Sequence, residues 1–215
     1  MNTQLKAILW DFGGVFTTSP FEAFARFEKE RGLPENFIRR VNSTNHETNA
    51  WAQFESGKIS HEQFDQMFEQ ESRELGHPVK GSDVLLLLSG QVRPRMVQAL
   101  MECKKHYSVG CITNNMKPAE TSDERVSWPP SETAKIMQLF DTIVESSVEG
   151  VRKPDPRIYN IACERLGCSP DQCVYLDDLG INLKPARAMG MITIKVMDPN
   201  VAIEQLADAT GLVFP

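Results

Sequence analysis

The stretch KAILWDFGGV, residues 6–15, decides the fold class of this chain. Its apolar part, Ala7 to Trp10, has the length of a strand that is buried on both faces. An aspartate follows at once, and two glycines after it permit a tight turn. The stretch therefore predicts a buried strand that carries a carboxylate, Asp11, at its carboxyl end.

Four similar apolar runs follow, and helical patterns separate them. The runs cover residues 107–112, 142–144, 173–176 and 192–196. Apolar residues recur at helical spacing over 93–105, 131–140, 155–166 and 183–189. Alternation of short buried strands with helices is typical of βαβ units in a parallel sheet. We therefore expect an α/β fold whose parallel sheet carries helices on both faces.

Residues 17–92 show no strand pattern. Phenylalanines recur at helical spacing from residue 21, and Ser19 and Ser60 each begin a capping-box pattern. We expect the aromatic residues to form the insert's own core rather than a cofactor pocket. The sequence predicts a core domain of residues 1–16 and 93–215, with a small all-helical cap of residues 17–92 inserted after the first strand.

Composition excludes several classes of partner. The 215 residues carry a net charge of −6, and the basic residues form no aromatic-interleaved patch, which argues against nucleic acid. The longest aliphatic run, residues 84–88, is too short to cross a membrane. The five cysteines are odd in number and lack a C-x-x-C pair, which argues against a disulfide framework and a zinc site. We expect a reduced, cytoplasmic protein without a membrane partner.

Polar side chains end three of the predicted strands, and a lysine opens the segment before a later helix. They are Asp11, Thr113, Asn114, Asp177 and Asp178, with Lys153 as the lysine. Ligands of an open parallel sheet bind at the carboxyl ends of its strands. Converging carboxylates repel one another unless a cation lies among them, and oxygen ligands suit Mg²⁺ together with a substrate phosphate.

Each of these residues also has an ordinary structural explanation. A single aspartate after a strand is most often a turn former or a helix N-cap. A single lysine is most often a solvated surface residue. The joint placement at several strand ends is what favours a Mg²⁺-dependent phosphoryl-transfer site, with one carboxylate free to attack.

Four segments resemble the haloacid dehalogenase-like (HAD) hydrolases, in order and in spacing. They are DFGGV at 11–15, ITN at 112–114, RKPDPRIY at 152–159 and LDDLGINL at 176–183. The resemblance is strongest to the phosphatase-like N-terminal domains of soluble epoxide hydrolase and of an acyl-CoA dehydrogenase family protein. It implies a Rossmann-like core with the first strand central and a helical cap between the first two segments.

The resemblance also implies site roles. Asp11 would be the nucleophile that forms an aspartyl-phosphate, and Lys153 would neutralise charge beside it. Thr113 and Asn114 would bind the phosphoryl group of a small phosphorylated metabolite. Mg²⁺ would be held by Asp11, the backbone carbonyl of Gly13 and Asp178, with Asp177 and Asn182 in support.

One departure from the family pattern limits the functional prediction. Family phosphatases carry a second aspartate two residues after the nucleophile, as general acid and base, and this chain has Gly13 there. His46, Glu47 and His61 are candidate replacements from the cap. We rank a phosphatase-type hydrolase first, a phosphate-ligand binding or regulatory module second, and a metal-independent 2-haloacid dehalogenase third. In the family, substrate specificity comes mostly from the cap. The polar segment 116–130 is a second candidate for a substrate-selecting element, because it is long enough to form a flap or a surface segment.

Overall fold

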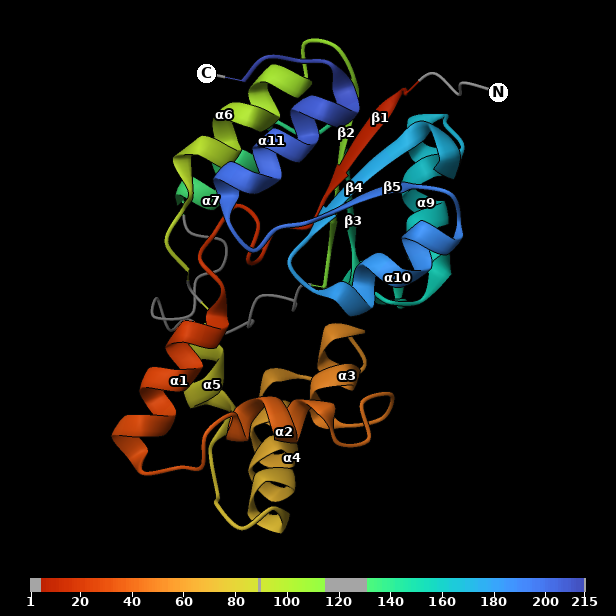
Figure 1. The fold of residues 1–215 in the computed structure, drawn as a ribbon. Helices are drawn as coiled ribbons and strands as arrows, with labels where there is room; N and C mark the ends of the chain where they lie inside the picture. Colours follow the sequence, from red (N-terminus) through yellow and green to blue (C-terminus); the bar gives the residue numbers. More distant parts are fainter. Residues whose placement is uncertain (1–4, 89, 115–130, 215) are drawn as a thin grey trace.

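The computed structural model describes residues 5–88, 90–114 and 131–214 (Figure 1). The segment 116–130, expected to be a flap or a surface segment, lies outside these ranges. Among the described helices, none combines the length and the apolar character that a membrane span requires.

Five parallel strands form one sheet in the order β3-β2-β1-β4-β5. Their bounds are β1 (Ala7–Trp10), β2 (Ser108–Thr113), β3 (Thr142–Glu145), β4 (Cys173–Asp177) and β5 (Ile192–Lys195). The first strand is central, as predicted, and each of the five expected apolar runs contributes one strand. Because all strands run the same way, their carboxyl ends share one edge of the sheet.

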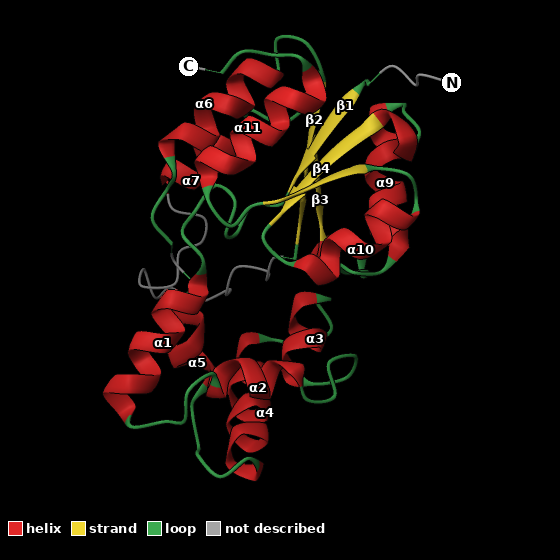
Figure 2. Cartoon of the chain, viewed as in Figure 1, coloured by secondary structure: helices red, strands yellow, loops and turns green. Residues whose placement is uncertain are grey.

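Alternate residues of β1 point to opposite faces of the sheet, and both faces are covered (Figure 2). Ile8 and Trp10 belong to a core with α6 (Pro94–Cys103), α7 (Ser131–Met137) and α11 (Pro199–Thr210). Ala7 and Leu9 belong to a second core with α9 (Pro156–Leu166) and α10 (Gly180–Ala188). Burial on both faces explains why the strands read as continuous apolar runs instead of alternating ones. The α/β prediction is confirmed.

Six described helices lie between β1 and β2 in the chain, and the first five of them form a separate group below the sheet (Figure 1). They are α1 (Pro20–Arg31), α2 (Phe37–Ser43), α3 (Ala50–Glu55), α4 (His61–Glu74) and α5 (Gly81–Leu86). Their aromatic residues, among them Phe24, Phe54 and Phe64, form a cluster of their own. The expectation that these stripes are core is therefore confirmed.

The two chain segments that connect this insert to the sheet are hydrogen-bonded to each other. Thr17 and Val92 form an isolated antiparallel bridge, and the Arg93 N–H donates to the Phe16 carbonyl at 2.7 Å. Both crossing points of the chain therefore lie side by side. We propose that they mark the boundary between the core of residues 1–16 and 93–215 and the cap of residues 17–92.

Three local details differ from the expectations. The Ser60 capping box forms, but the Ser19 hydroxyl makes no cap hydrogen bond, so that predicted box is wrong. The last expected helix begins at Gly180 rather than at residue 183, because Leu179 serves as its N-cap. The described core also contains elements that the sequence analysis did not predict, namely the helix α11, the short helix α8 (Ser146–Glu149) and a 3₁₀ turn, η2 (Pro170–Gln172).

Candidate active site

The carboxyl ends of β1, β2 and β4 bring polar side chains to one edge of the sheet. Asp11 directly follows β1, and its N–H donates to the Leu176 carbonyl of β4 at 2.8 Å. Thr113 and Asp177 are the last residues of β2 and β4, the two strands that flank β1. The three residues are buried, so they face protein rather than bulk solvent.

Three carboxylates gather at this edge. Asp11, Asp177 and Asp178 each offer an oxygen, and these oxygens lie within 4.8 Å of one another. Such a group is repulsive by itself. A positive charge is therefore required to make the arrangement stable.

Lys153 supplies one positive charge inside the group. Its Nζ lies 2.7 Å from Oδ1 of Asp11 and 2.9 Å from Oδ2 of Asp177, and the residue is 2% exposed. Burial by itself lowers the pKa of this ammonium, but the charges of Asp11 and Asp177 outweigh burial and raise it. Lys153 is therefore a permanent cation that bridges two of the carboxylates.

Asn114 positions the backbone of Lys153. Its Nδ2 donates to the Lys153 carbonyl at 3.1 Å, and its Oδ1 accepts from the Lys153 N–H at 2.8 Å. Both polar groups of this amide are thus engaged with one residue. We infer that the side chain of Asn114 orients Lys153, whereas the resemblance implied contact with the phosphoryl group.

Asp177 is held by a set of donors. Asn182 Nδ2 lies 3.1 Å from both carboxylate oxygens, and the Leu179 N–H donates to Oδ1 at 2.8 Å. The Tyr175 hydroxyl donates to Oδ2, and the Tyr159 hydroxyl fixes the Asn182 carbonyl at 2.7 Å. Both carboxylate oxygens of the buried Asp177 therefore accept hydrogen bonds, and Asp177 holds Lys153 and Asn182 in place.

Sequence analysis did not identify Tyr159 and Tyr175 as site residues. Tyr175 lies two residues before Asp177 on β4, so both side chains point to the same face of the sheet. This spacing in the sequence could have placed Tyr175 next to Asp177. Tyr159 comes from α9 and meets Tyr175 at a ring-centroid distance of 5.3 Å, which only packing of the helix on the sheet brings about.

Asp11 and Asp178 resist ionisation when no cation lies between them. Burial is the largest cause that raises the pKa of Asp178 to about 6; Asp177 adds to the rise, while Lys153 and Arg93 oppose it. Burial also raises the pKa of Asp11 well above its ordinary value, against the opposing charge of Lys153. When all three carboxyl groups are ionised, they and the Lys153 ammonium carry a net charge of −2, which one divalent cation would balance.

The donor set fits Mg²⁺. Carboxylate and carbonyl oxygens at this edge are hard ligands, and Mg²⁺ uses one or two protein carboxylates together with water and phosphate oxygens. Asp11, Asp178 and the Gly13 carbonyl are the residues that would hold the ion, while Asp177 is occupied by Lys153 and its other donors. The observed charge imbalance therefore favours the cation that the sequence predicts.

Two neighbouring glycines at this site have different physical roles. Gly14 has a φ of +75°, and a Cβ added to it would lie 2.2 Å from Oδ2 of Asp178. Gly13 has an ordinary φ, and a Cβ there would meet no atom within 4 Å. Gly14 is therefore needed for the approach of Asp178, whereas a side chain added at Gly13 would begin in open space.

Gly14→Ala is expected to weaken Mg²⁺ binding and to destabilise the fold by about 1–2 kcal/mol, because alanine is strained in the left-handed region and displaces Asp178. Isothermal titration with Mg²⁺ and urea unfolding measure the two effects. Gly13→Ala is the matched control and should keep both values near those of the parent protein. Equal Mg²⁺ affinity in the two variants would contradict the role given to Gly14.

His46, Glu47 and His61, the cap residues considered as proton donors, have different surroundings in the structure. His61 packs against Phe54 at a ring-centroid distance of 4.7 Å, and burial lowers its pKa. His46 accepts, through its carbonyl, a hydrogen bond of 2.9 Å from Arg152. Glu47 is exposed.

Glu55 is a cap carboxyl that sequence analysis did not identify. It is buried and paired with Arg152, the neighbour of Lys153, and burial raises its pKa against the charges of Arg152 and Lys153. The cap therefore contacts the core beside Lys153.

A comparison with protein families decides the identity. The model of the haloacid dehalogenase-like hydrolases matches residues 5–190. The chain belongs to this family. Membership in the HAD-like family agrees with the parallel sheet, the helical insert and the carboxylate edge described above.

Curated relatives of this HAD-like hydrolase match nearly the whole chain. Mouse acyl-CoA dehydrogenase family member 10 is 33% identical over 98% of this chain, and mouse bifunctional epoxide hydrolase 2 is 31% identical over 98%. The chain spans only 19% and 40% of the length of these two proteins. Sesquiterpene phosphatase astK of Aspergillus oryzae is 30% identical over 98% of this chain and 100% of its own length.

Solved structures share the HAD-like fold. A HAD family enzyme from Bacteroides thetaiotaomicron, in complex with magnesium and inorganic phosphate, superposes with a TM-score of 0.61 at 20% identity, covering 89% of this chain and 93% of its own. A dehalogenase with an intermediate complex reaches 0.64 at 17% identity, covering 99% of this chain and 100% of its own. At these identities the likeness concerns the fold.

Proposed function

We propose that this HAD-like hydrolase is a Mg²⁺-dependent phosphomonoesterase that acts on a small phosphorylated metabolite through an aspartyl-phosphate on Asp11. The observation that carries the proposal is the Lys153 ammonium between Asp11 and Asp177, inside a group of three carboxylates. This arrangement supplies a fixed nucleophile together with a site for phosphate charge. The resemblance to sesquiterpene phosphatase astK over its full length supports the reaction class.

Asp11 is held in a fixed orientation. Its Oδ1 accepts hydrogen bonds from the Phe12 N–H at 2.7 Å and lies 2.7 Å from Lys153 Nζ. Fixing a nucleophile before reaction removes part of the entropic barrier. We propose that a carboxylate oxygen of Asp11 attacks phosphorus, the phosphorus–oxygen bond to the substrate breaks, and the leaving oxygen takes up a proton.

Lys153 and Thr113 offer a positive charge and a hydrogen-bond donor for the phosphoryl group that is transferred. Lys153 and the Thr113 hydroxyl would bind its oxygens, in a site that is largely closed to solvent and therefore has a low effective dielectric. Bound Mg²⁺ would neutralise the negative charge of the phosphate oxygens. Water then attacks the phosphorus of the aspartyl-phosphate, the phosphorus–oxygen bond to Asp11 breaks, and inorganic phosphate and the Asp11 carboxylate are released.

Gly13 is the reason for a second candidate. No side chain at this position can protonate the leaving oxygen or activate water, and general acid–base catalysis is worth about 10²–10⁴-fold. A protein that binds phosphate ligands with little turnover would keep every other feature of the site. Beryllium or aluminium fluoride should bind together with Mg²⁺ to a phosphomonoesterase and to a binding module alike. Only the phosphomonoesterase should hydrolyse a phosphate monoester.

A dehalogenase reaction needs neither Mg²⁺ nor a proton for its leaving group. The three converging carboxylates argue against it, because a metal-independent site has no use for their negative charge. Chloride release from 2-chloropropionate in the presence of a chelator would favour the dehalogenase over the phosphomonoesterase. We expect none.

The test of the proposed function is a panel of phosphorylated metabolites, including isoprenoid phosphates, assayed with and without Mg²⁺. Phosphate release that requires Mg²⁺ and depends on substrate identity supports the phosphomonoesterase. Release that is equal after chelation contradicts it. Tight Mg²⁺-dependent binding of beryllium fluoride without any release identifies the binding module instead.

Mg²⁺ affinity is expected to rise with pH through about 6. Burial and Asp177 raise the pKa of Asp178 to about 6, against Lys153 and Arg93, so a proton competes with the ion below that pH. Each unit below about 6 should cost about tenfold in affinity. Isothermal titration from pH 5 to pH 8 measures this, and a flat profile would contradict the role of Asp178.

The metal-free protein should show the opposite trend in stability. A carboxyl whose pKa is raised on folding stabilises the folded state at low pH, and this contribution is lost as the pH rises through the folded value. Thermal unfolding should therefore show that Mg²⁺ stabilises the protein more at pH 7.5 than at pH 5.

A further inference from the structure

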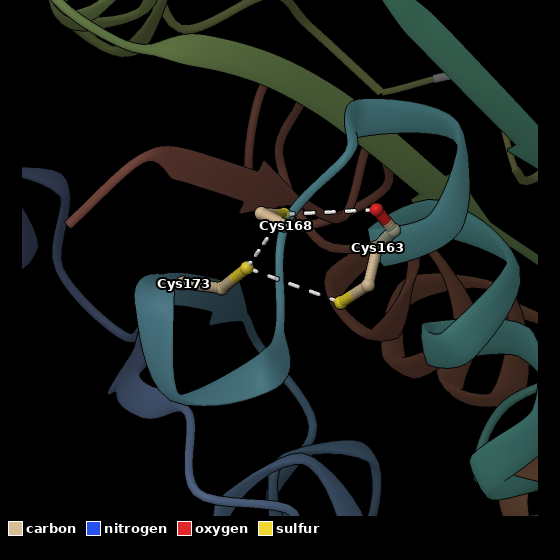
Figure 3. Close-up of side chains that lie close together, drawn as sticks. All are labelled: Cys163, Cys168 and Cys173. Atoms are coloured by element: carbon tan, nitrogen blue, oxygen red, sulfur yellow. Dashed lines mark hydrogen bonds between the residues drawn. The ribbon is translucent and has the colours of Figure 1, made fainter. Parts of the chain in front are cut away.

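Three of the five cysteines lie close together (Figure 3). They lie at the amino end of β4, whereas the candidate active site lies at its carboxyl end. Cys163 lies in the last turn of α9, and Gly167 ends that helix with a φ of +63°. The chain then turns back through Cys168 and the 3₁₀ turn η2, and Cys173 begins β4. The spacing C-x₄-C-x₄-C is no familiar ligand pattern, and the turn after α9 is what brings the three thiols together.

The sulfur–sulfur distances match those of a metal–thiolate centre. Sγ of Cys173 lies 3.4 Å from Sγ of Cys168 and 3.9 Å from Sγ of Cys163, and all three sulfur atoms lie within 4.8 Å of one another. Thiolates bound to one Zn²⁺ at about 2.3 Å are about 3.8 Å apart in tetrahedral geometry and about 4.0 Å apart in trigonal geometry. A cation shared by the three sulfurs therefore requires the sulfur–sulfur distances to change by at most about 1 Å.

The surroundings suit a buried site with one open side. Cys163 and Cys173 are 3% and 0% exposed, whereas Cys168 is half-buried and offers a route of entry. The Cys173 thiol also reaches the Ser169 carbonyl at 3.4 Å, and the Cys168 thiol reaches the Cys163 carbonyl at 3.7 Å.

We propose that the thiolates of Cys163, Cys168 and Cys173 bind one thiophilic d¹⁰ cation, Zn²⁺ or Cu⁺. Soft sulfur ligands select such ions and do not suit Mg²⁺. Zn²⁺ would complete its coordination with solvent on the open side at Cys168, and Cu⁺ would be three-coordinate. Binding requires the loss of the thiol protons to solvent.

This site is distinct from the carboxylate edge. Cys173 and Asp177 are the two ends of β4, about 13 Å apart at strand spacing. The cation would tie the end of α9 to the start of β4, two elements that also carry Tyr159 and Asp177. It would act as a structural clamp for the supporting side of the active site and would contact no substrate.

The test uses the full chain, reduced and stripped of metal, with saturating Mg²⁺ present so that the oxygen site is occupied. Co²⁺ and Cd²⁺ serve as probes because their thiolate charge-transfer absorption reports sulfur ligation alone. We expect one equivalent to produce the absorption band and to raise the melting temperature. Zn²⁺ should displace the probe, and Cu⁺, supplied with a competing chelator, identifies the second possible occupant.

Cys168→Ser is the test variant, because its half-buried position tolerates serine best. Its affinity for Co²⁺ should fall at least about tenfold and the charge-transfer band should weaken or vanish. Cys103→Ser is the matched control, since Cys103 is buried on α6 outside the cluster and should bind as the parent does. Circular dichroism confirms that both variants are folded.

Two outcomes would overturn the proposal. One is the absence of a thiolate band in the parent protein at several equivalents of Co²⁺ and Cd²⁺. The other is a band that persists unchanged in Cys168→Ser. Neither outcome bears on phosphatase activity, because the probe reads sulfur ligation and not turnover.

Discussion

Gly13→Asp is expected to raise kcat for a simple aryl phosphate by about 10²–10⁴-fold. The added carboxyl would stand two residues after Asp11, where it can protonate the leaving oxygen and then activate water. The gain corresponds to about 3–5 kcal/mol of barrier. Steady-state phosphate release at saturating Mg²⁺ measures it.

The structure permits this substitution. Gly13 does not occupy the left-handed region, and an added Cβ would meet no atom within 4 Å. The backbone carbonyl expected to bind Mg²⁺ is unchanged by it. A loss of fold or of metal affinity is therefore not expected, and thermal unfolding with Mg²⁺ titration checks both.

Gly13→Asn is the control, because it has nearly the same shape and no proton to transfer at neutral pH. Its kcat should stay near that of the parent protein. An equal gain in both variants would show that polarity at this position, rather than acid–base chemistry, limits turnover. No gain in Gly13→Asp, with Mg²⁺ still bound, would mean either that another group, such as Glu55 of the cap, already supplies the proton, or that phosphoryl transfer is not the reaction.

Asp11→Asn is expected to remove hydrolysis to the limit of detection, at least about 10⁴-fold below the parent, because the amide is not a nucleophile toward phosphorus. The fold should persist. Burial, Asp177 and Asp178 raise the pKa of Asp11 against the opposing charge of Lys153, so the ionised form is costly in the metal-free protein. A neutral amide relieves this cost, and Lys153 keeps its partner Asp177 at 2.9 Å.

Thermal unfolding without Mg²⁺ should therefore give Asp11→Asn a melting temperature equal to or above that of the parent. Any residual activity must be separated from contaminating phosphatases. The double variant Asp11→Asn/Lys153→Ala serves this purpose, since a contaminant leaves the same residual rate in both preparations. A folded Asp11→Asn protein that retains more than about a hundredth of the parent rate, and loses it in the double variant, would refute the nucleophile assignment.

Local chemistry explains what the sequence revealed. The order of strands and helices follows from short apolar runs that alternate with helical periodicity, and both patterns are properties of neighbouring residues. The carboxylates could be assigned to one edge because parallel strands end at the same edge, whatever their order in the sheet. For that reason Asp11, Thr113 and Asp177 were predictable as a group, and their chemistry predicted a cation.

The tertiary structure alone decided the contacts that make this group a site. Asn114 meets the backbone of Lys153 across 39 residues of chain, and Tyr159 reaches Asn182 only because α9 packs on the sheet. The approach of Asp178 to Gly14 and the meeting of three cysteines likewise depend on where distant segments turn. A sequence pattern reports the period and the turn chemistry of each segment, but side-chain contacts between segments are set by packing, which no single segment encodes.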